Sequence, residues 1–184
     1  MALAARELGL FLGERYGVNI EDPAFREVHG SDAICAKVAA RNAAYDVWGW
    51  KHPQPTGYLK SIYPALRNLR FIFLTRDMTA TALGIAKRES MAAGEAIDNV
   101  ASIQRRHYEL LQQLDRPTLF VSYEKLLLWP DAVIGELAHF LGMDCDQSIC
   151  DQIRKQIVPG RYQPASRYGL RGKLRDTARL WLTS

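Results

Sequence analysis

Two short runs of strand-forming residues, separated by a long helical pattern, restrict the possible folds more than any other feature of this chain. Residues 71–75 read FIFLT and residues 118–122 read TLFVS, and neither run alternates between apolar and polar residues. Continuous apolar runs are typical of parallel strands buried on both faces. Between them, residues 95–114 repeat apolar side chains at helical spacing. The order strand, helix, strand predicts a βαβ unit with a parallel sheet, whose buried residues should include Phe71, Phe73, Leu119 and Val121.

Weaker patterns extend this prediction to the rest of the chain. One more short strand is expected at residues 47–50, because Pro53 and Pro55 stop a helix there. Helices are expected at residues 2–16, from Ser31 toward Tyr45, at residues 58–66, after Asp77, from about Asp131 to Gly142, and from Asp146 to Gln156. The predicted fold class is therefore α/β, a parallel sheet flanked by helices, in a single domain over residues 1–184.

Composition favours a globular chain in a reducing compartment. Apolar residues make up 48% of the sequence and charged residues 24%. Three cysteines are too few for a disulfide framework, and none has a partner at zinc-binding spacing, so we expect a cytoplasmic protein without a metal. No apolar run approaches the roughly 20 residues that cross a bilayer. Charges at Arg6, Glu7 and Glu14 favour an amphipathic helix over a signal peptide.

Charge is distributed unevenly along the chain. Residues 154–184 contain eight Lys or Arg and one acidic residue, whereas the first 153 residues contain sixteen basic and nineteen acidic ones. Such a basic stretch binds phosphate, sulfate, nucleic acid or another polyanion, or else it is a solvated tail. Residues 166–184 are accordingly treated as a separate basic C-terminal segment, and polyanion binding through this stretch is one hypothesis for the function.

Polar residues follow each predicted strand, where ligands bind in open α/β sheets. Lys51 and His52 follow the first strand, Arg76 and Asp77 the second, and residues 122–124 the third. A lysine and an arginine that converge there suit a phosphate or sulfate group. Each cluster also has a structural interpretation. Arg76 and Asp77 would form an ion pair that caps the next helix, and of residues 123–124 the tyrosine would pack while the glutamate caps the following turn. His52 would be a polar residue in a proline-bent loop rather than a general base.

Three blocks and a short closing segment of the sequence resemble bacterial proteins of the sulfotransferase family. WGWKHP at residues 48–53 resembles the family's WGWKDP segment, and FIFLTRD at residues 71–77 resembles its strand ending in RDP. VSYEKLLLWPDAVIGELAHFLGM at residues 121–143 resembles its YEDL and FLGL block, and VPGRY at residues 158–162 resembles its closing segment. The blocks occur in the family's order and span about residues 31–165.

The resemblance implies both a fold and a chemistry. The fold would be a three-layer sandwich related to P-loop NTPases, and the activity would be transfer of a sulfuryl group from 3′-phosphoadenosine 5′-phosphosulfate (PAPS) to a hydroxyl or amine. Arg76 matches an arginine that binds the 3′-phosphate, and Lys51 matches a lysine beside the sulfuryl group. His52, the second candidate catalytic residue, stands where the family commonly has Asp. Arg171 and Lys173 are candidates for the basic segment that closes the cofactor pocket.

Two features depart from the family pattern. The sequence contains no GxPRSGT phosphate loop, so the sheet is expected to be incomplete at its N-terminal strand and to leave an edge of residues 71–75 exposed. Gly84 stands where a serine hydroxyl normally contacts the 3′-phosphate, and loss of such a bond costs about 1.5–3 kcal/mol. The alternative to a PAPS-dependent enzyme is therefore a non-catalytic sulfotransferase-like domain.

Overall fold

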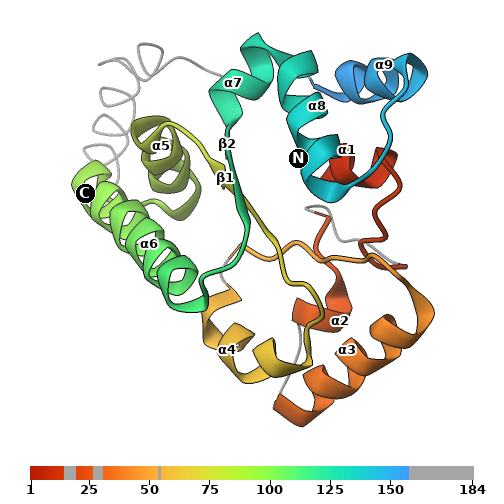
Figure 1. The fold of residues 1–184 in the computed structure, drawn as a ribbon. Coiled ribbons are helices and arrows are strands. Elements are labelled where there is room, and N and C mark those ends of the chain that lie inside the picture. The colour runs from red at the N-terminus through yellow and green to blue at the C-terminus, as the bar shows by residue number, and fades with distance from the viewer. Residues whose placement is uncertain (15–19, 27–30, 54, 158–184) are drawn as a thin grey trace, which may run out of the picture. The chain divides into compact units, whose positions relative to one another are not determined.

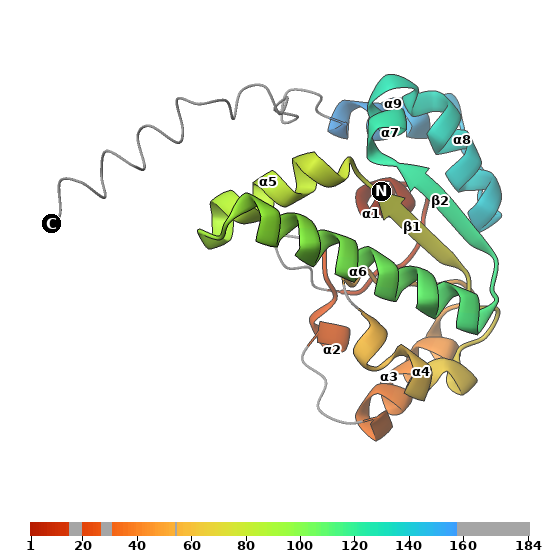
Figure 2. The ribbon, with the colours of Figure 1, turned by 90° about the vertical axis from the view of Figure 1, so that its left-hand side faces the viewer.

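Two parallel strands pair in a sheet with helices on both faces. The structure, a computed structural model, describes residues 1–14, 20–26, 31–53 and 55–157. Strands β1 (Phe71–Thr75) and β2 (Thr118–Ser122) lie side by side in both views (Figures 1 and 2), and their register pairs Phe71 with Thr118 and Thr75 with Ser122. The predicted α/β class, a parallel sheet flanked by helices, is confirmed.

The chain divides into two compact units, which are described separately. The larger unit comprises Met1–Thr75 and Ile103–Ile157, and the smaller one includes Arg76–Ser102. The larger unit contains both strands, the C-terminal half of α6, two 3₁₀ turns (Pro55–Gly57 and Tyr63–Ala65), and the helices α1 (Ala2–Glu7), α2 (Pro23–Arg26), α3 (Ser31–Ala44), α4 (Leu59–Ile62), α7 (Tyr123–Leu128), α8 (Pro130–Leu141) and α9 (Gln147–Gln156). The smaller unit contains α5 (Met78–Glu89) and the first half of α6, which spans Ala93–Leu114.

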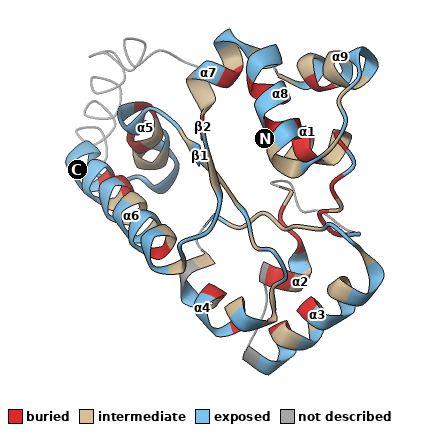
Figure 3. Ribbon diagram, in the orientation of Figure 1, coloured by how far each residue is buried: buried red, intermediate tan, exposed pale blue. Residues whose placement is uncertain are grey.

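One face of the sheet packs against α1, α8 and α9. Ile72 and Leu119, which are paired in the register, contact the cluster around Ile134 and Leu137 of α8. Both α8 residues are fully buried. Helices α1 and α8 carry several of the buried residues coloured red in Figure 3. This cluster therefore forms the main core beneath the sheet.

The other face of the sheet packs against the C-terminal half of α6. The Phe73 ring lies 5.6 Å from the His107 ring and 5.3 Å from the Tyr108 ring, measured between centroids. Phe71 contacts a second buried cluster, which consists of Phe25, Ile34, Val38, Leu59, Ile62 and Leu110. Because helices cover both faces, the larger unit has the layered order that the βαβ pattern predicts.

Burial of the strands on both faces was predicted, and this prediction is wrong in part. Val121 is buried, whereas Phe71, Phe73 and Leu119 are only half-buried. Phe120 keeps 56% of its surface exposed, and Leu74 on β1 is also exposed. Within the described residues the sheet has two strands, so each strand has one edge without a neighbouring strand, and side chains beside that edge stay accessible.

Two predicted elements before residue 51 differ in the structure. The helix expected at residues 2–16 ends at Glu7, because Gly9 adopts a φ of +103° that cannot continue a right-handed helix. The strand expected at residues 47–50 is reduced to one isolated parallel bridge between Phe11 and Trp48. The glycine therefore changes the chain from helix to an extended segment that pairs with the residues before Lys51.

Helices α5, α8 and α9 each have one end that follows the capping rules. Asp77 and Asp146 accept hydrogen bonds from the amides of Ala80 and Ile149 at the start of α5 and α9, and Gly142 ends α8 with a φ of +68°. The C-terminal helices expected up to Gly142 and Gln156 are confirmed within a residue. Helix α7, which begins directly after the Ser122 cap, was not predicted, because a six-residue helix carries too little periodicity to be recognised.

In the smaller unit, α5 and the first half of α6 pack through small side chains. Ala82 and Ala96 are fully buried and contact Val100 in one cluster.

Among the helices in the described part of the chain, none is both long and apolar enough to span a membrane. The basic C-terminal segment, residues 166–184, lies outside the described residues.

Candidate functional site

Lys51 follows a short segment that is held in place by aromatic side chains. The rings of Trp48 and Trp50 stack on Phe25 at centroid distances of 5.7 Å and 4.9 Å. Each indole also donates a hydrogen bond, Trp48 to Asn42 at 3.1 Å and Trp50 to the hydroxyl of Tyr58 at 2.8 Å. Burial raises the pKa of Tyr58 to about 12, so this hydroxyl stays protonated at neutral pH. The backbone before Lys51 is therefore fixed by packing and by hydrogen bonds.

The ammonium group of Lys51 forms an ion pair with Glu21. Its Nζ lies 2.7 Å from Oε1 of Glu21, and the two side chains are 35% and 10% exposed. The lysine thus reaches the surface with part of its side chain, while the carboxylate lies inside. Sequence reasoning missed Glu21, because the two residues are thirty positions apart and no local pattern links them.

A second ion pair lies directly beside the first along the chain. Asp22 accepts hydrogen bonds from the Arg41 guanidinium at 3.0 Å and from the Ala24 amide at 2.9 Å. The guanidinium carbon of Arg41 lies 4.5 Å from the centroid of the Phe11 ring, which is a cation–π distance. Asp22 is 5% exposed and Arg41 is 15% exposed, so the carboxylate is buried and the guanidinium is largely shielded from solvent. Two adjacent carboxylates therefore each hold one cation in the larger unit.

His52 packs edge-on against Tyr58, with 5.5 Å between the ring centroids. A second histidine lies near the same loop: the ring of His107 forms a hydrogen bond with the backbone of Pro53. Burial lowers the pKa of His107, although the bond to Pro53 opposes this shift. The half-buried position of His52 is compatible with a role in proton transfer, and that role stays a proposal.

Arg76 and Gly84 belong to the smaller unit. Arg76 directly follows β1 and is exposed, and Asp77 caps α5 by accepting the Ala80 amide at 2.6 Å. The capping role that we considered for Asp77 is therefore confirmed. Gly84 lies about two turns into α5 and is exposed, with no heavy atom within 4 Å of the position where a Cβ would stand. A larger residue at Gly84 would fit without a clash.

The polar residues after β2 serve the local backbone. The Ser122 Oγ accepts the amide of Lys125 at the start of α7, and it donates to the carboxylate of Glu124 at 2.8 Å. The cap of α7 is therefore Ser122, whereas packing and capping had been expected of residues 123–124. Arg171 and Lys173, the other candidate cofactor residues, lie outside the described residues. In the described part of the chain, no three or more His, Cys, Asp or Glu side chains gather as a metal site would require.

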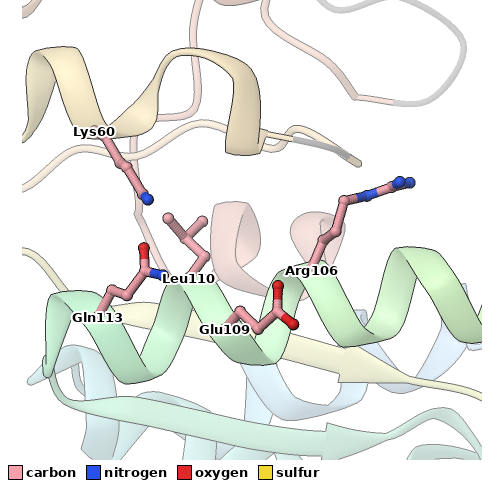
Figure 4. A pocket seen from close by; sticks show the side chains of 5 residues that line it. All are labelled: Lys60, Arg106, Glu109, Leu110 and Gln113. Atoms are coloured by element: carbon pink, nitrogen blue, oxygen red, sulfur yellow. The ribbon is translucent and has the colours of Figure 1, made fainter.

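A polar cavity of about 160 Å³ opens between α4 and α6 in the larger unit (Figure 4). Lys60 points from α4 toward α6, and the remaining lining residues, Arg106, Glu109, Leu110 and Gln113, come from α6. Its lining mixes both signs of charge around one buried leucine. Sequence analysis did not single out the four polar residues, because each reads as part of an ordinary solvent-facing helix surface, whereas Leu110 belongs to the apolar face of the helix expected at residues 95–114.

Comparison with known proteins gives the context for this geometry. A sequence model described as the sulfotransferase family matches residues 18–147. The chain belongs to the sulfotransferase family. No curated protein and no solved structure matches it. The segment matched to the sulfotransferase family includes Glu21, Lys51, His52, Arg76 and Gly84, and it ends before Arg171 and Lys173.

Proposed function

We propose that this chain transfers a sulfuryl group from PAPS to the hydroxyl or amine of an acceptor. The observation that carries the proposal is the match to the sulfotransferase family over residues 18–147. The matched range contains Lys51 and Arg76, which stand in the WGWKHP and FIFLTRD segments that resemble the family's anion-binding segments. PAPS would supply an activated sulfuryl group with a phosphate leaving group. The acceptor oxygen or nitrogen would form the new bond to sulfur as the bond to that phosphate breaks.

The residues of the chain would each contribute a different interaction. Lys51 would stabilise the negative charge that develops on the leaving phosphate, because its side chain is partly exposed and its backbone is held by the tryptophan stack. His52 would accept the proton of the acceptor. Arg76 would bind the 3′-phosphate through charge-assisted hydrogen bonds, and we extend this proposal to Arg171 and Lys173.

The donor site fits only part of the PAPS molecule. A lysine and an arginine suit its phosphate and sulfate groups, but the sequence has no GxPRSGT loop to bind the 5′-phosphosulfate with backbone amides. Gly84 also supplies no hydroxyl. We therefore expect weak binding of the product analogue 3′-phosphoadenosine 5′-phosphate (PAP), with a Kd of about 1 mM or higher.

Gly84→Ser tests the donor site by a gain of affinity. The added hydroxyl has open space around it, and a hydrogen bond to a charged group contributes about 1.5–3 kcal/mol, so PAP should bind roughly tenfold to a hundredfold more tightly. Gly84→Ala is the matched control, because it changes helix propensity without adding a donor. Calorimetry should show tighter binding for the serine variant alone, and Arg76→Ala in that background should remove the gain.

An activity measurement separates the enzyme from a non-catalytic domain. Transfer of labelled sulfuryl from PAPS to a panel of hydroxyl and amine acceptors should be detectable in Gly84→Ser and should be lost in Lys51→Met. PAP binding without transfer to any acceptor would support a non-catalytic sulfotransferase-like domain. Equal PAP affinity in the serine and alanine variants would contradict the assignment of the 3′-phosphate site.

A further inference from the structure

The charge of Lys51 is already balanced within the fold. Its ammonium lies 2.7 Å from the Glu21 carboxylate, which is only 10% exposed. The neighbouring carboxylate of Asp22 is paired with Arg41 in the same way. In these two ion pairs of the described residues each cation faces one carboxylate, so the positive charge of Lys51 is offset by a buried negative charge 2.7 Å away.

The Glu21 carboxylate has direct consequences for an anion that approaches Lys51. An ammonium group has three N–H donors, one of which is directed to Glu21, and the exposed third of the side chain leaves room for another ligand. The carboxylate nevertheless repels the incoming negative charge and competes for the same donors. Because Glu21 is buried, solvent screens this repulsion less than it would at the surface.

We propose that Glu21 is a positioning residue that holds the Lys51 ammonium as an internal counter-anion, which an incoming phosphate or sulfate group must share or displace. The proposal rests on the donor site assigned above to Lys51. It gives Glu21 two effects of opposite sign: it orients the lysine, and it lowers the affinity of the site for anions. A residue with only a structural role would not lower anion affinity, and the two cases therefore predict opposite results.

Glu21→Gln tests the proposal, because the amide keeps the size of the side chain and removes its charge. Calorimetry with two probes, PAP and inorganic pyrophosphate, should show about five- to tenfold tighter binding of both than in the wild type. In a Lys51→Met background, Glu21→Gln should change either affinity by less than about twofold, because Glu21 acts through the lysine. Asp46→Asn, which removes an exposed carboxylate five residues before Lys51, is the control for net charge and should also change affinity by less than about twofold.

The outcomes separate this proposal from the proposed function. Unchanged or weaker pyrophosphate binding in Glu21→Gln would overturn the proposal that Glu21 restrains Lys51. A gain of affinity that persists in the Lys51→Met background would overturn the same proposal. If Glu21→Gln fails to fold, Glu21→Ala provides the same charge change and should show the same gain. If PAP binds no better than pyrophosphate in every variant, the PAPS site is refuted, while the pyrophosphate series still decides whether Glu21 restrains Lys51.

Discussion

Gly13→Ala should disrupt the buried ion pair between Asp22 and Arg41. Gly13 has a φ of +122°, and a Cβ there would stand 2.6 Å from Oδ2 of Asp22 and 2.7 Å from its Cγ. A non-glycine residue in such a conformation costs about 1–3 kcal/mol. Asp22 cannot move freely, since it is buried and holds Arg41, so its displacement should add about 2 kcal/mol to the loss of stability.

Gly9→Ala is the matched control for this prediction. Gly9 has a comparable φ of +103°, but no atom lies within 4 Å of its Cβ position, so this variant measures the backbone strain alone. Urea unfolding followed by circular dichroism should give a free energy of unfolding about 2 kcal/mol lower for Gly13→Ala than for Gly9→Ala. For a chain of 184 residues, this corresponds to a difference in Tm of roughly 4–8 °C.

A double-mutant cycle identifies the origin of the difference. In an Asp22→Ala background the carboxylate is gone, and the extra cost of Gly13→Ala over Gly9→Ala should fall to about 0.5 kcal/mol or less. Equal losses for the two glycine variants in the wild-type background would refute the reasoning. An extra cost that survives the removal of the Asp22 carboxylate would refute it as well, because the contact that we hold responsible would then be absent.

Two further predictions concern the core and the pH dependence of stability. Leu137→Ala removes a fully buried side chain of α8 and should lower the free energy of unfolding, measured by urea titration, by about 2–5 kcal/mol. The control Leu128→Ala changes a residue that is 67% exposed and should alter the free energy of unfolding by about 0.5 kcal/mol or less. Burial lowers the pKa of His107 in the folded protein. As the pH falls through about 6.5, His107 is therefore protonated in the unfolded chain before it is protonated in the folded one. The contribution of His107 to the free energy of unfolding is present above that pH and is lost as the pH falls below it. Denaturation between pH 7 and 5 should therefore show a smaller loss of stability for His107→Asn than for the wild type. Identical slopes for the two proteins would show that His107 does not titrate in this way.

The sequence predicts the βαβ unit well, because each of its elements is specified locally. The runs at residues 71–75 and 118–122 consist of strand formers, and Asp77 and Asp146 start helices through their own side chains. Strand burial was harder to predict. An apolar run specifies a strand that can be covered on both faces, but the exposure of Phe120 depends on how many strands pair beside it.

The sequence predicted the basic residues of the candidate site, but it did not predict the carboxylates that form ion pairs in it. Lys51 and Arg76 stand out because they follow strand-forming runs and match a family pattern. Glu21 and Asp22 do not, since a carboxylate becomes significant only when the fold brings a distant cation to it. The same holds for α1, where Gly9 was compatible with a helical pattern until its backbone conformation ended that helix.

The stacked rings of Trp48, Trp50 and Phe25 also provide an optical reporter. The two indole rings lie 5.6 Å apart at an interplanar angle of 29°, close enough for their electronic transitions to couple and to contribute to the near-ultraviolet circular dichroism. Trp50 directly precedes Lys51 in the chain and Trp48 lies two residues before Trp50, whereas Trp129, at the C-terminal end of α7, is exposed. A change in the position of Lys51 can therefore be followed through its own neighbouring chromophores, without an attached label.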